Sequence, residues 1–236
     1  MSSEFTASEA GKVLENANLI KKYHGNLIYD YTEYPTKGIW TEEFGHDQYK
    51  KAICDWFPGN QKKPVLFYVH TPFCEQLCNF CLCSKEITQD YSKVKSYLYD
   101  YLAKELDMLE KHLTDNKINF NFKEIYLGGG SPTYYKKEEF KYLVGRLRNL
   151  IDFNNLGDFT IEVDPRRVTE ENLLFYHEMG VNRLSFGIQD FDHGVQEEIN
   201  RIQPPELLDK LLTPEIRKLF PVINFDLLIG LPRQTT

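Results

Sequence analysis

Residues 64–83 read PVLFYVHTPFCEQLCNFCLC, an apolar run followed at once by four cysteines. Short runs rich in β-branched and aromatic residues are typical of buried strands, so residues 64–70 are predicted to form a strand. The cysteines then lie on the loop that leaves its carboxyl end. Cys74, Cys78 and Cys81 have the spacing C-x3-C-x2-C. The segment therefore predicts a strand that brings several thiols to one edge of a sheet.

This group of thiols indicates a metal centre. Thiolates are the soft ligands that iron–sulfur clusters and zinc prefer, and three on one short loop can hold three corners of a cubane while one iron stays open. Structural zinc usually takes four ligands in two separated pairs, although Cys83 or His70 could supply a fourth ligand here. The spacing favours a cluster over zinc. Cys54 stands apart and is expected to be structural.

The rest of the chain alternates predicted strands and helices. Four further apolar runs are KEIYLG (123–128), FTIEVD (159–164), NRLSFG (182–187) and VINFDLLIG (222–230). Apolar spacings of three and four predict a helix over 91–112. Residues 137–152, 169–179 and 194–219 are predicted to form further helices, the last broken by prolines. Five strands separated by helices predict an α/β fold around a parallel sheet.

The turns that follow the strands carry unusual residues. Cysteines follow the first strand, three glycines the second, Asp164-Pro165 the third and Gln189-Asp190 the fourth. Active sites of parallel α/β folds lie at this carboxyl edge. His70, at the end of the first strand, is expected to order the cysteine loop by hydrogen bonding.

The domain organisation is expected to be simple. Residues 1–60 lack the alternation and are expected to form an irregular N-terminal arm, whereas residues 61–236 form the core. The chain stops at LPRQTT, directly after the fifth strand, with no helix to cover it. We therefore expect a partial (β/α) barrel, truncated after the fifth strand, that is the N-terminal part of a longer protein.

Composition and charge narrow the function class. The chain has 236 residues, 28 Lys and Arg against 35 Asp and Glu, and a formal net charge of -7. This balance argues against a nucleic-acid partner, because phosphate binding needs a basic face. No apolar run reaches the length of about 20 residues that a membrane span needs, and the N-terminus has no apolar signal region. We expect a cytoplasmic protein, with no membrane or nucleic acid, that acts on a small molecule.

The motifs resemble those of the radical S-adenosylmethionine (SAM) enzymes, in the oxygen-independent coproporphyrinogen III oxidase branch. The resemblance extends from about Tyr31 to Pro232, with the motifs in the same order and at similar spacing. They are YTEYPTKGIWTEEFG (31–45), FYVHTPFCEQLCNFCLCSKEIT (67–88), LGGGSPTY (127–134), IEVDPR (161–166), NRLSFGIQDF (182–191), INR (199–201) and FDLLIGLP (225–232). The resemblance implies a partial radical SAM barrel.

The resemblance also implies cofactors and site residues. Cys74, Cys78 and Cys81 would bind a [4Fe-4S] cluster whose fourth iron is chelated by SAM. Cys83 completes a C-x-C that is typical of this branch but is not a cluster ligand there. Contacts to the SAM on the cluster are implied for Tyr68, Phe80, Gly129 and Glu162. A second SAM molecule is implied beside Gly130, Ser131, Gln189, Arg201 and Asp226. Gly128, Gly129 and Gly130 also suit a ligand site for a physical reason, since backbone groups without side chains can approach a ligand closely.

The activity that the resemblance implies is the oxidative decarboxylation of coproporphyrinogen III to protoporphyrinogen IX in haem (porphyrin) biosynthesis. The reduced cluster would split SAM into methionine and a 5'-deoxyadenosyl radical. The chain would thus be an oxidoreductase whose partners are a tetrapyrrole substrate and an electron donor such as flavodoxin or ferredoxin. No protein side chain is expected to act as a catalytic nucleophile. The fragment alone is expected to bind the cofactors without necessarily turning over porphyrinogen.

Three alternatives stay open. Asp30 stands where an arginine is expected in the oxidase, and Cys-Leu-Cys-Ser stands where the oxidase commonly has Cys-Gly-Cys-Asn. A sister radical SAM methylase or cyclopropanase of the same branch is therefore the first alternative. A haem chaperone of the same fold is the second, although Cys83 and Tyr34-Pro35-Thr36 favour the enzyme. A zinc-stapled binding module is the third.

Overall fold

The computed structural model describes residues 41–235. The chain divides into a first unit that ends at Ala52 and a second unit that comprises Ile53–Thr236. The expected arm, residues 1–60, lies largely outside the described residues, as do Asp30 and Tyr34-Pro35-Thr36. Its described part includes helix α2 (His46–Trp56), where irregular structure was expected, and the 3-10 turn η2 (Phe57–Gly59).

The second unit contains a five-stranded parallel sheet, as the sequence predicts. The strands are β1 (Pro64–Thr71), β4 (Asn121–Gly129), β5 (Asp158–Val163), β6 (Arg183–Gln189) and β7 (Val222–Leu227). They lie in the order β1-β4-β5-β6-β7, and every neighbouring pair is parallel. Sequence order and spatial order coincide, so the loops after all five strands leave from the same edge of the sheet.

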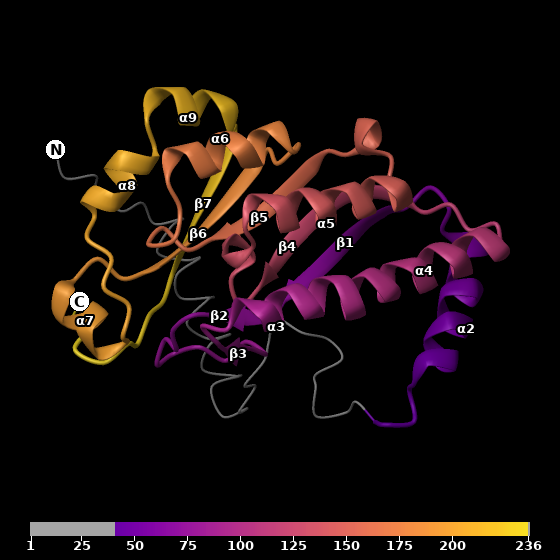
Figure 1. The fold of residues 1–236 in the computed structure, drawn as a ribbon, viewed down its shortest axis with the longest axis horizontal. Coiled ribbons are helices and arrows are strands. Elements are labelled where there is room, and N and C mark those ends of the chain that lie inside the picture. Colours follow the sequence, from indigo (N-terminus) through magenta and orange to yellow (C-terminus); the bar gives the residue numbers. More distant parts are fainter. Residues whose placement is uncertain (1–40, 236) are drawn as a thin grey trace, which may run out of the picture. The chain divides into compact units, whose positions relative to one another are not determined.

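Helices cover one face of this sheet (Figure 1). The predicted helix over 91–112 is continuous but comprises α3 (Tyr91–Ser96), a π-helical segment η3 (Tyr97–Leu102) and α4 (Ala103–Asp115). Next come α5 (Lys137–Leu150) and α6 (Glu170–Glu178). The predicted helix over 194–219 is three short helices, α7 (His193–Glu198), α8 (Glu206–Leu211) and α9 (Pro214–Leu219). Prolines interrupt it because they lack the backbone N–H that a continuing helix needs.

Helix α6 shows how the sequence sets these boundaries. Thr169 caps its first turn, and the Thr169 and Asn172 side chains each accept a hydrogen bond from the other residue's backbone N–H. Such a cap contributes about 0.5–2 kcal/mol. Gly180 ends the helix with φ +104, a conformation that L side chains rarely adopt.

The hydrophobic core lies between the sheet and these helices. Fully buried side chains from both layers meet there, and they include Ile125, Leu127, Phe140, Leu143, Leu147, Phe159, Ile161, Leu184 and Phe186. Alternate residues on the strands face away from the helices. Tyr126 and Glu162 belong to that second set and are only half-buried. The apolar face thus fixes the strand register, and the opposite face is left for polar side chains.

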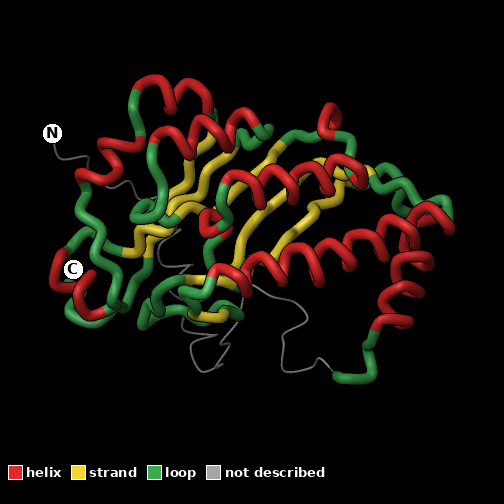
Figure 2. Tube along the Cα trace, viewed as in Figure 1, coloured by secondary structure: helices red, strands yellow, loops and turns green. Residues whose placement is uncertain are grey.

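Short elements at the carboxyl edge complete the unit (Figure 2). Strands β2 (Phe73–Cys74) and β3 (Glu86–Ile87) pair in parallel at the two ends of the cysteine segment, which the sequence did not predict. The 3-10 turn η4 (Pro132–Tyr134) follows β4 at this edge, whereas η5 (Phe153–Asn155) lies between α5 and β5, at the opposite edge. Within residues 41–235, no helix is both long and apolar enough to cross a membrane.

Candidate functional site

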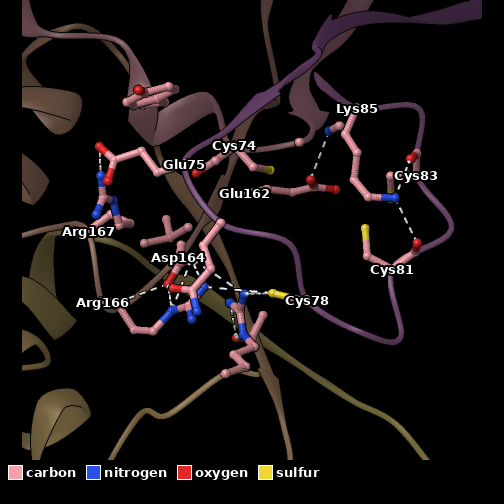
Figure 3. A pocket seen from close by; sticks show the side chains of 18 of the residues that line it. Cys74, Glu75, Cys78, Cys81, Cys83, Lys85, Glu162, Asp164, Arg166 and Arg167 are labelled. Atoms are coloured by element: carbon pink, nitrogen blue, oxygen red, sulfur yellow. Dashed lines mark hydrogen bonds and ion pairs between the residues drawn. The ribbon is translucent and has the colours of Figure 1, made fainter. Parts of the chain in front are cut away.

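A cavity of about 450 Å³ opens at the carboxyl edge of the sheet. The loops after β1, β4, β5 and β6 line it, together with Asp226 of β7 (Figure 3). All but one of the expected site residues border this cavity, namely Cys74, Cys78, Phe80, Cys81, Gly129, Gly130, Ser131, Glu162, Gln189, Arg201 and Asp226. The exception is Tyr68. The site therefore brings together residues that are far apart in sequence. The most distant two, Cys74 and Asp226, are separated by 152 positions.

The cysteine loop surrounds one side of the cavity. Cys78 is buried, Cys74 and Cys81 are half-buried, Cys83 is exposed, and none forms a disulfide. Figure 3 shows the thiols of Cys74, Cys78 and Cys81 on different sides of the same space. Among residues 41–235, no three His, Cys, Asp or Glu side chains lie close enough together to hold a single metal ion. The thiols thus border a volume and do not converge on a point.

Two thiols of this loop, Cys74 and Cys83, have raised pKa values. Burial, followed by the nearby Cys81 and Cys78, raises the pKa of Cys74 to about 11. Burial, followed by Cys81, also raises the pKa of Cys83. A metal ligand must be a thiolate, so a metal centre that binds here displaces protons.

Hydrogen bonds anchor the cysteine loop to the segment after α7. The backbone N–H of Asn79 donates to the carbonyl of Ile199 at 2.9 Å. Asn200 accepts from the Gln76 side chain at 2.7 Å and donates to the carbonyl of Leu77 at 2.7 Å. Asn200 itself has φ +55, a conformation that asparagine tolerates better than most residues. The loop is therefore clamped between Cys74 and Cys81 by a distant part of the chain.

His70 fixes the other end of the loop, as the sequence predicts. Its Nε2 lies 2.7 Å from the carbonyl oxygen of Ser84, and its Nδ1 lies 3.0 Å from the hydroxyl of Tyr68. Tyr68 stacks on Tyr126 with ring centroids 6.0 Å apart. Burial, followed by the charge of Glu162, raises the pKa of Tyr68 to about 12. Tyr68 therefore lies next to the site without bordering its cavity.

The glycine turn after β4 packs directly against β1. Gly129 has φ +115, and a Cβ there would lie 2.6 Å from Cε1 of His70. The backbone N–H of Gly130 donates to the carbonyl of Thr71 at 2.7 Å, and a Cβ on Gly130 would lie 2.8 Å from the carbonyl oxygen of Phe73. The sequence analysis explained these glycines by the close approach of their backbone to a ligand. The structure requires them also for close approach of two backbone segments.

Glu162 on β5 presents a carboxylate to the cavity. It accepts hydrogen bonds from the hydroxyl of Tyr126 at 3.0 Å and from the backbone N–H of Gly129 at 3.0 Å. Burial raises the pKa of Glu162, although these two hydrogen bonds act in the opposite direction. The carboxylate is thus oriented by the protein at a cost in solvation.

The residues expected around a second SAM also border the cavity. The Ser131 hydroxyl lies 3.0 Å from that of Thr133, and Gln189 ends β6 with φ +71. Asp226 is exposed and accepts from Ser185 at 3.1 Å and Asn224 at 2.8 Å. The guanidinium of Arg201 is buried and already engaged, since it donates to the carbonyl of Gly187 at 2.7 Å and contacts Asp164 at 3.4 Å.

Asp164 and Arg166 are among the cavity residues to which the sequence analysis gave no role. Asp164 accepts two side-chain hydrogen bonds from Arg166, at 2.9 Å from Nε and 2.7 Å from the terminal nitrogen. The Arg166 guanidinium also reaches the sulfur of Cys78 at 3.8 Å. Both residues lie in the motif IEVDPR, and Asp164-Pro165 had been noted as an unusual pair at a strand end, but neither was given a role. Their position at the carboxyl edge was the available signal.

Comparisons with known proteins agree with this geometry. The family model described as "Radical SAM superfamily" matches residues 68–236. A Pseudomonas aeruginosa protein named oxygen-independent coproporphyrinogen III oxidase is 35% identical over 223 residues, which cover 93% of this chain and 47% of that protein. The Escherichia coli protein of the same name is 36% identical over 220 residues, covering 92% and 45%.

A solved structure extends the comparison to the fold. It is that of the Escherichia coli coproporphyrinogen III oxidase, described as a radical SAM enzyme, and it superposes with a TM-score of 0.75 at 35% identity. The match covers 89% of this chain and 46% of that one. The chain thus spans about half the length of the relatives that it matches.

Proposed function

Since this chain belongs to the radical SAM superfamily, we propose that Cys74, Cys78 and Cys81 hold a [4Fe-4S] cluster with SAM beside it in the cavity. The observation that carries the proposal is the meeting of three thiols, a glycine turn and Glu162 around one cavity. Each belongs to a different loop or strand of a parallel sheet, at the edge where such folds place their active sites.

The residues present fit the cluster better than they fit a single ion. A tetrahedral zinc holds thiolates about 2.3 Å away, so its ligands must converge on one point. The thiols here instead border a common space, and the described residues offer no three-ligand site for a single ion. A cubane spreads its ligands over several irons, and thiolates are its usual ligands. The donor set and its spacing therefore both favour the cluster over the zinc-stapled module.

Bound together, the cluster and SAM supply a one-electron cleavage of the sulfonium that starts radical chemistry. The protein residues bind and orient. Glu162 offers a fixed carboxylate that suits a ribose diol, and the turn at Gly129 and Gly130 leaves room for the methionine end of SAM. We propose Tyr68 and Phe80 as further contacts to this SAM.

A second SAM is proposed in the same cavity. Its contacts would come from Gly130, Ser131, Gln189, Arg201 and Asp226, all of which border the cavity. Asp226 is exposed there and can accept hydrogen bonds from a hydroxyl or amine. Arg201 would have to exchange one of its present partners to bind a carboxylate. Asp226 is therefore the stronger of the two candidates.

The substrate we propose is coproporphyrinogen III, whose propionates would be oxidatively decarboxylated to give protoporphyrinogen IX in haem biosynthesis. The support comes from relatives that are named for this activity. This chain matches about half the length of each of them. These names favour the oxidase over a methylase, a cyclopropanase or a haem chaperone. A low-potential flavodoxin or ferredoxin would donate the electron, in a cytoplasm that keeps the thiols reduced.

One anaerobic assay tests both the proposed cofactors and the proposed substrate. The protein is reconstituted with iron and sulfide, reduced with dithionite, and incubated with SAM with and without coproporphyrinogen III. Chromatography then measures 5'-deoxyadenosine and the porphyrins. We expect 5'-deoxyadenosine, formed faster when coproporphyrinogen III is present. An equal rate with and without coproporphyrinogen III would overturn the substrate, and absence of 5'-deoxyadenosine would overturn the cofactor assignment.

A further inference from the structure

Two buried guanidinium groups converge on the sulfur of Cys78. A terminal nitrogen of Arg201 lies 3.5 Å from Sγ of Cys78, and a terminal nitrogen of Arg166 lies 3.8 Å from it. The two side chains are only 9% and 17% exposed. Within residues 41–235, no arginine makes such a contact with Cys74 or Cys81. Cys78 is therefore the one of these three cysteines whose sulfur is contacted by guanidinium groups.

Asp164 holds Arg166 in this position. It accepts from Nε and from a terminal nitrogen of Arg166, at 2.9 and 2.7 Å, and also from the Arg166 backbone N–H at 3.0 Å. Although burial alone raises the pKa of Asp164, the hydrogen bonds from Arg166 and the charge of Arg201 bring it below its ordinary value. The carboxylate is thus ionised, and the group of Asp164, Arg166 and Arg201 carries one net positive charge.

Arg201 is fixed independently of Arg166. Its Nε and one terminal nitrogen donate to the carbonyl of Gly187 at 3.2 and 2.7 Å, and Nε also donates to Gln203 at 3.2 Å. These partners leave the remaining nitrogen for Asp164 and Cys78. Removal of Arg166 therefore need not displace Arg201.

Hydrogen bonds and positive charge at a ligand sulfur act on cluster reduction. Reduction adds one negative charge to the cluster and its thiolates, and a nearby buried cation stabilises that added charge. The effect is strong where solvent is excluded, because the local dielectric constant is low. Two donors on one sulfur make the reduced state more favourable.

We propose that Arg166, positioned by Asp164, acts with Arg201 through the sulfur of Cys78 to raise the reduction potential of the cluster. This inference rests on the proposed function, since it requires the cluster on Cys74, Cys78 and Cys81. Arg166 is a tuning residue at a ligand sulfur, and Asp164 is the positioning residue behind it. Neither was among the residues expected to contact cofactor.

A redox titration of the reconstituted protein, followed by EPR of the reduced cluster, tests the proposal. At the potential where the wild-type cluster is half reduced, Arg166→Gln should lower the ratio of reduced to oxidised cluster about tenfold. For a one-electron couple this corresponds to a reduction potential about 59 mV lower. Arg166→Lys keeps the charge without the forked geometry and should show a smaller decrease. EPR reports only loaded protein, so incomplete reconstitution of a variant does not distort its potential.

Two further variants separate tuning from general charge effects. Arg167→Gln removes the same charge from the next residue, whose partner is Glu75 and which does not contact Cys78, so its potential should match the wild type. Asp164→Asn removes a negative charge, which by charge alone would raise the potential. If Asp164 positions Arg166, the potential should fall instead. A rise in Asp164→Asn would overturn the positioning role.

The outcomes distinguish failure of the tuning proposal from failure of the proposed cluster site. If the wild type takes up no iron and sulfide, the cluster site and the tuning proposal are both overturned. If the wild type and Arg166→Gln carry clusters of equal potential, only the tuning proposal is overturned. Circular dichroism of the metal-free variants identifies any that fail to fold, and Arg166→Lys then provides the decisive comparison.

Discussion

The backbone N–H of Gly129 donates to Oε2 of Glu162 at 3.0 Å, which ties the turn after β4 to the middle of the site on β5. The other carboxylate oxygen accepts from Tyr126 at 3.0 Å. The turn and the carboxylate therefore hold each other in place across two strands. Both groups are ones that we propose to contact SAM, so the protein orders them before any ligand binds.

Glu162 should make the folded protein less stable as the pH rises. Burial raises its pKa above the ordinary 4.5, so its contribution to stability is complete below about pH 4.5 and is lost as pH rises through the folded-state pKa. The groups around it are Tyr126, Asp226 and His70, together with the neighbouring Tyr68 and Cys83. Glutamine does not titrate, so the free energy of unfolding of Glu162→Gln relative to the wild type should increase with pH.

Urea titrations of the metal-free proteins at several pH values measure this difference. Glu171→Gln is the control, because Lys137 lowers the pKa of Glu171 and its difference from the wild type should not grow between about pH 5 and 8. A Glu162→Gln difference that is independent of pH, or that shrinks as pH rises, would contradict the assigned environment.

Gly129→Ala should damage the site, whereas Gly145→Ala should not. At Gly129 the Cβ would lie 2.6 Å from the His70 ring on a backbone with φ +115, and such strain costs about 1–3 kcal/mol. Gly145 lies exposed in α5 with no atom near a Cβ, so alanine there should stabilise the protein by about 0.5–1 kcal/mol. Thermal unfolding measures both. Equal effects of the two substitutions would rule out a close-packed glycine turn.

Asn200 should govern how long the cysteine loop retains its cluster. Asn200→Gly removes the hydrogen bonds to Gln76 and Leu77, and Asn200→Ala adds the strain of an L side chain at φ +55, which costs about 1–2 kcal/mol more. Cluster loss in the presence of a chelator should be slowest in the wild type, faster in Asn200→Gly and fastest in Asn200→Ala. The decay of visible absorbance follows it, and identical rates in all three proteins would refute the clamp.

The individual cysteines should divide into ligands and non-ligands. Alanine at Cys74, Cys78 or Cys81 should reduce cluster iron to a small fraction of the wild-type content, because each thiol would hold one corner. Alanine at Cys83 or Cys54 should leave most of it, since Cys83 is exposed and Cys54 lies 3.6 Å from His112, away from the cavity. Iron and sulfide analysis after anaerobic reconstitution measures the outcome. Loss of the cluster in Cys83→Ala would require a different ligand set.

Much of the fold could be predicted because the signal is local. All five strands appear where short apolar runs were identified, and α5 and α6 appear at the predicted helices over 137–152 and 169–179. The predicted helix over 194–219 was divided into three because its prolines break hydrogen bonding at several points. The pairing of β2 with β3 was missed because each comprises two residues, too few to show any periodicity.

The site was predictable only in part. The resemblance implied twelve site residues, eleven of which border one cavity, whereas their proposed ligand contacts remain predictions. The role of Arg166 could not be found from sequence, because its contact with Cys78 joins residues 88 positions apart. The engagement of Arg201 by Gly187 and Asp164 was likewise invisible, since it depends on how two strand ends and the segment after α7 come together.

The most direct test of the central claim is EPR of the dithionite-reduced, anaerobically reconstituted protein, recorded with and without SAM. The account predicts about one cluster per chain, held by Cys74, Cys78 and Cys81, and a signal that changes when SAM is added. A colourless, iron-free protein after strict exclusion of oxygen, or a cluster signal that SAM leaves unchanged, would contradict it.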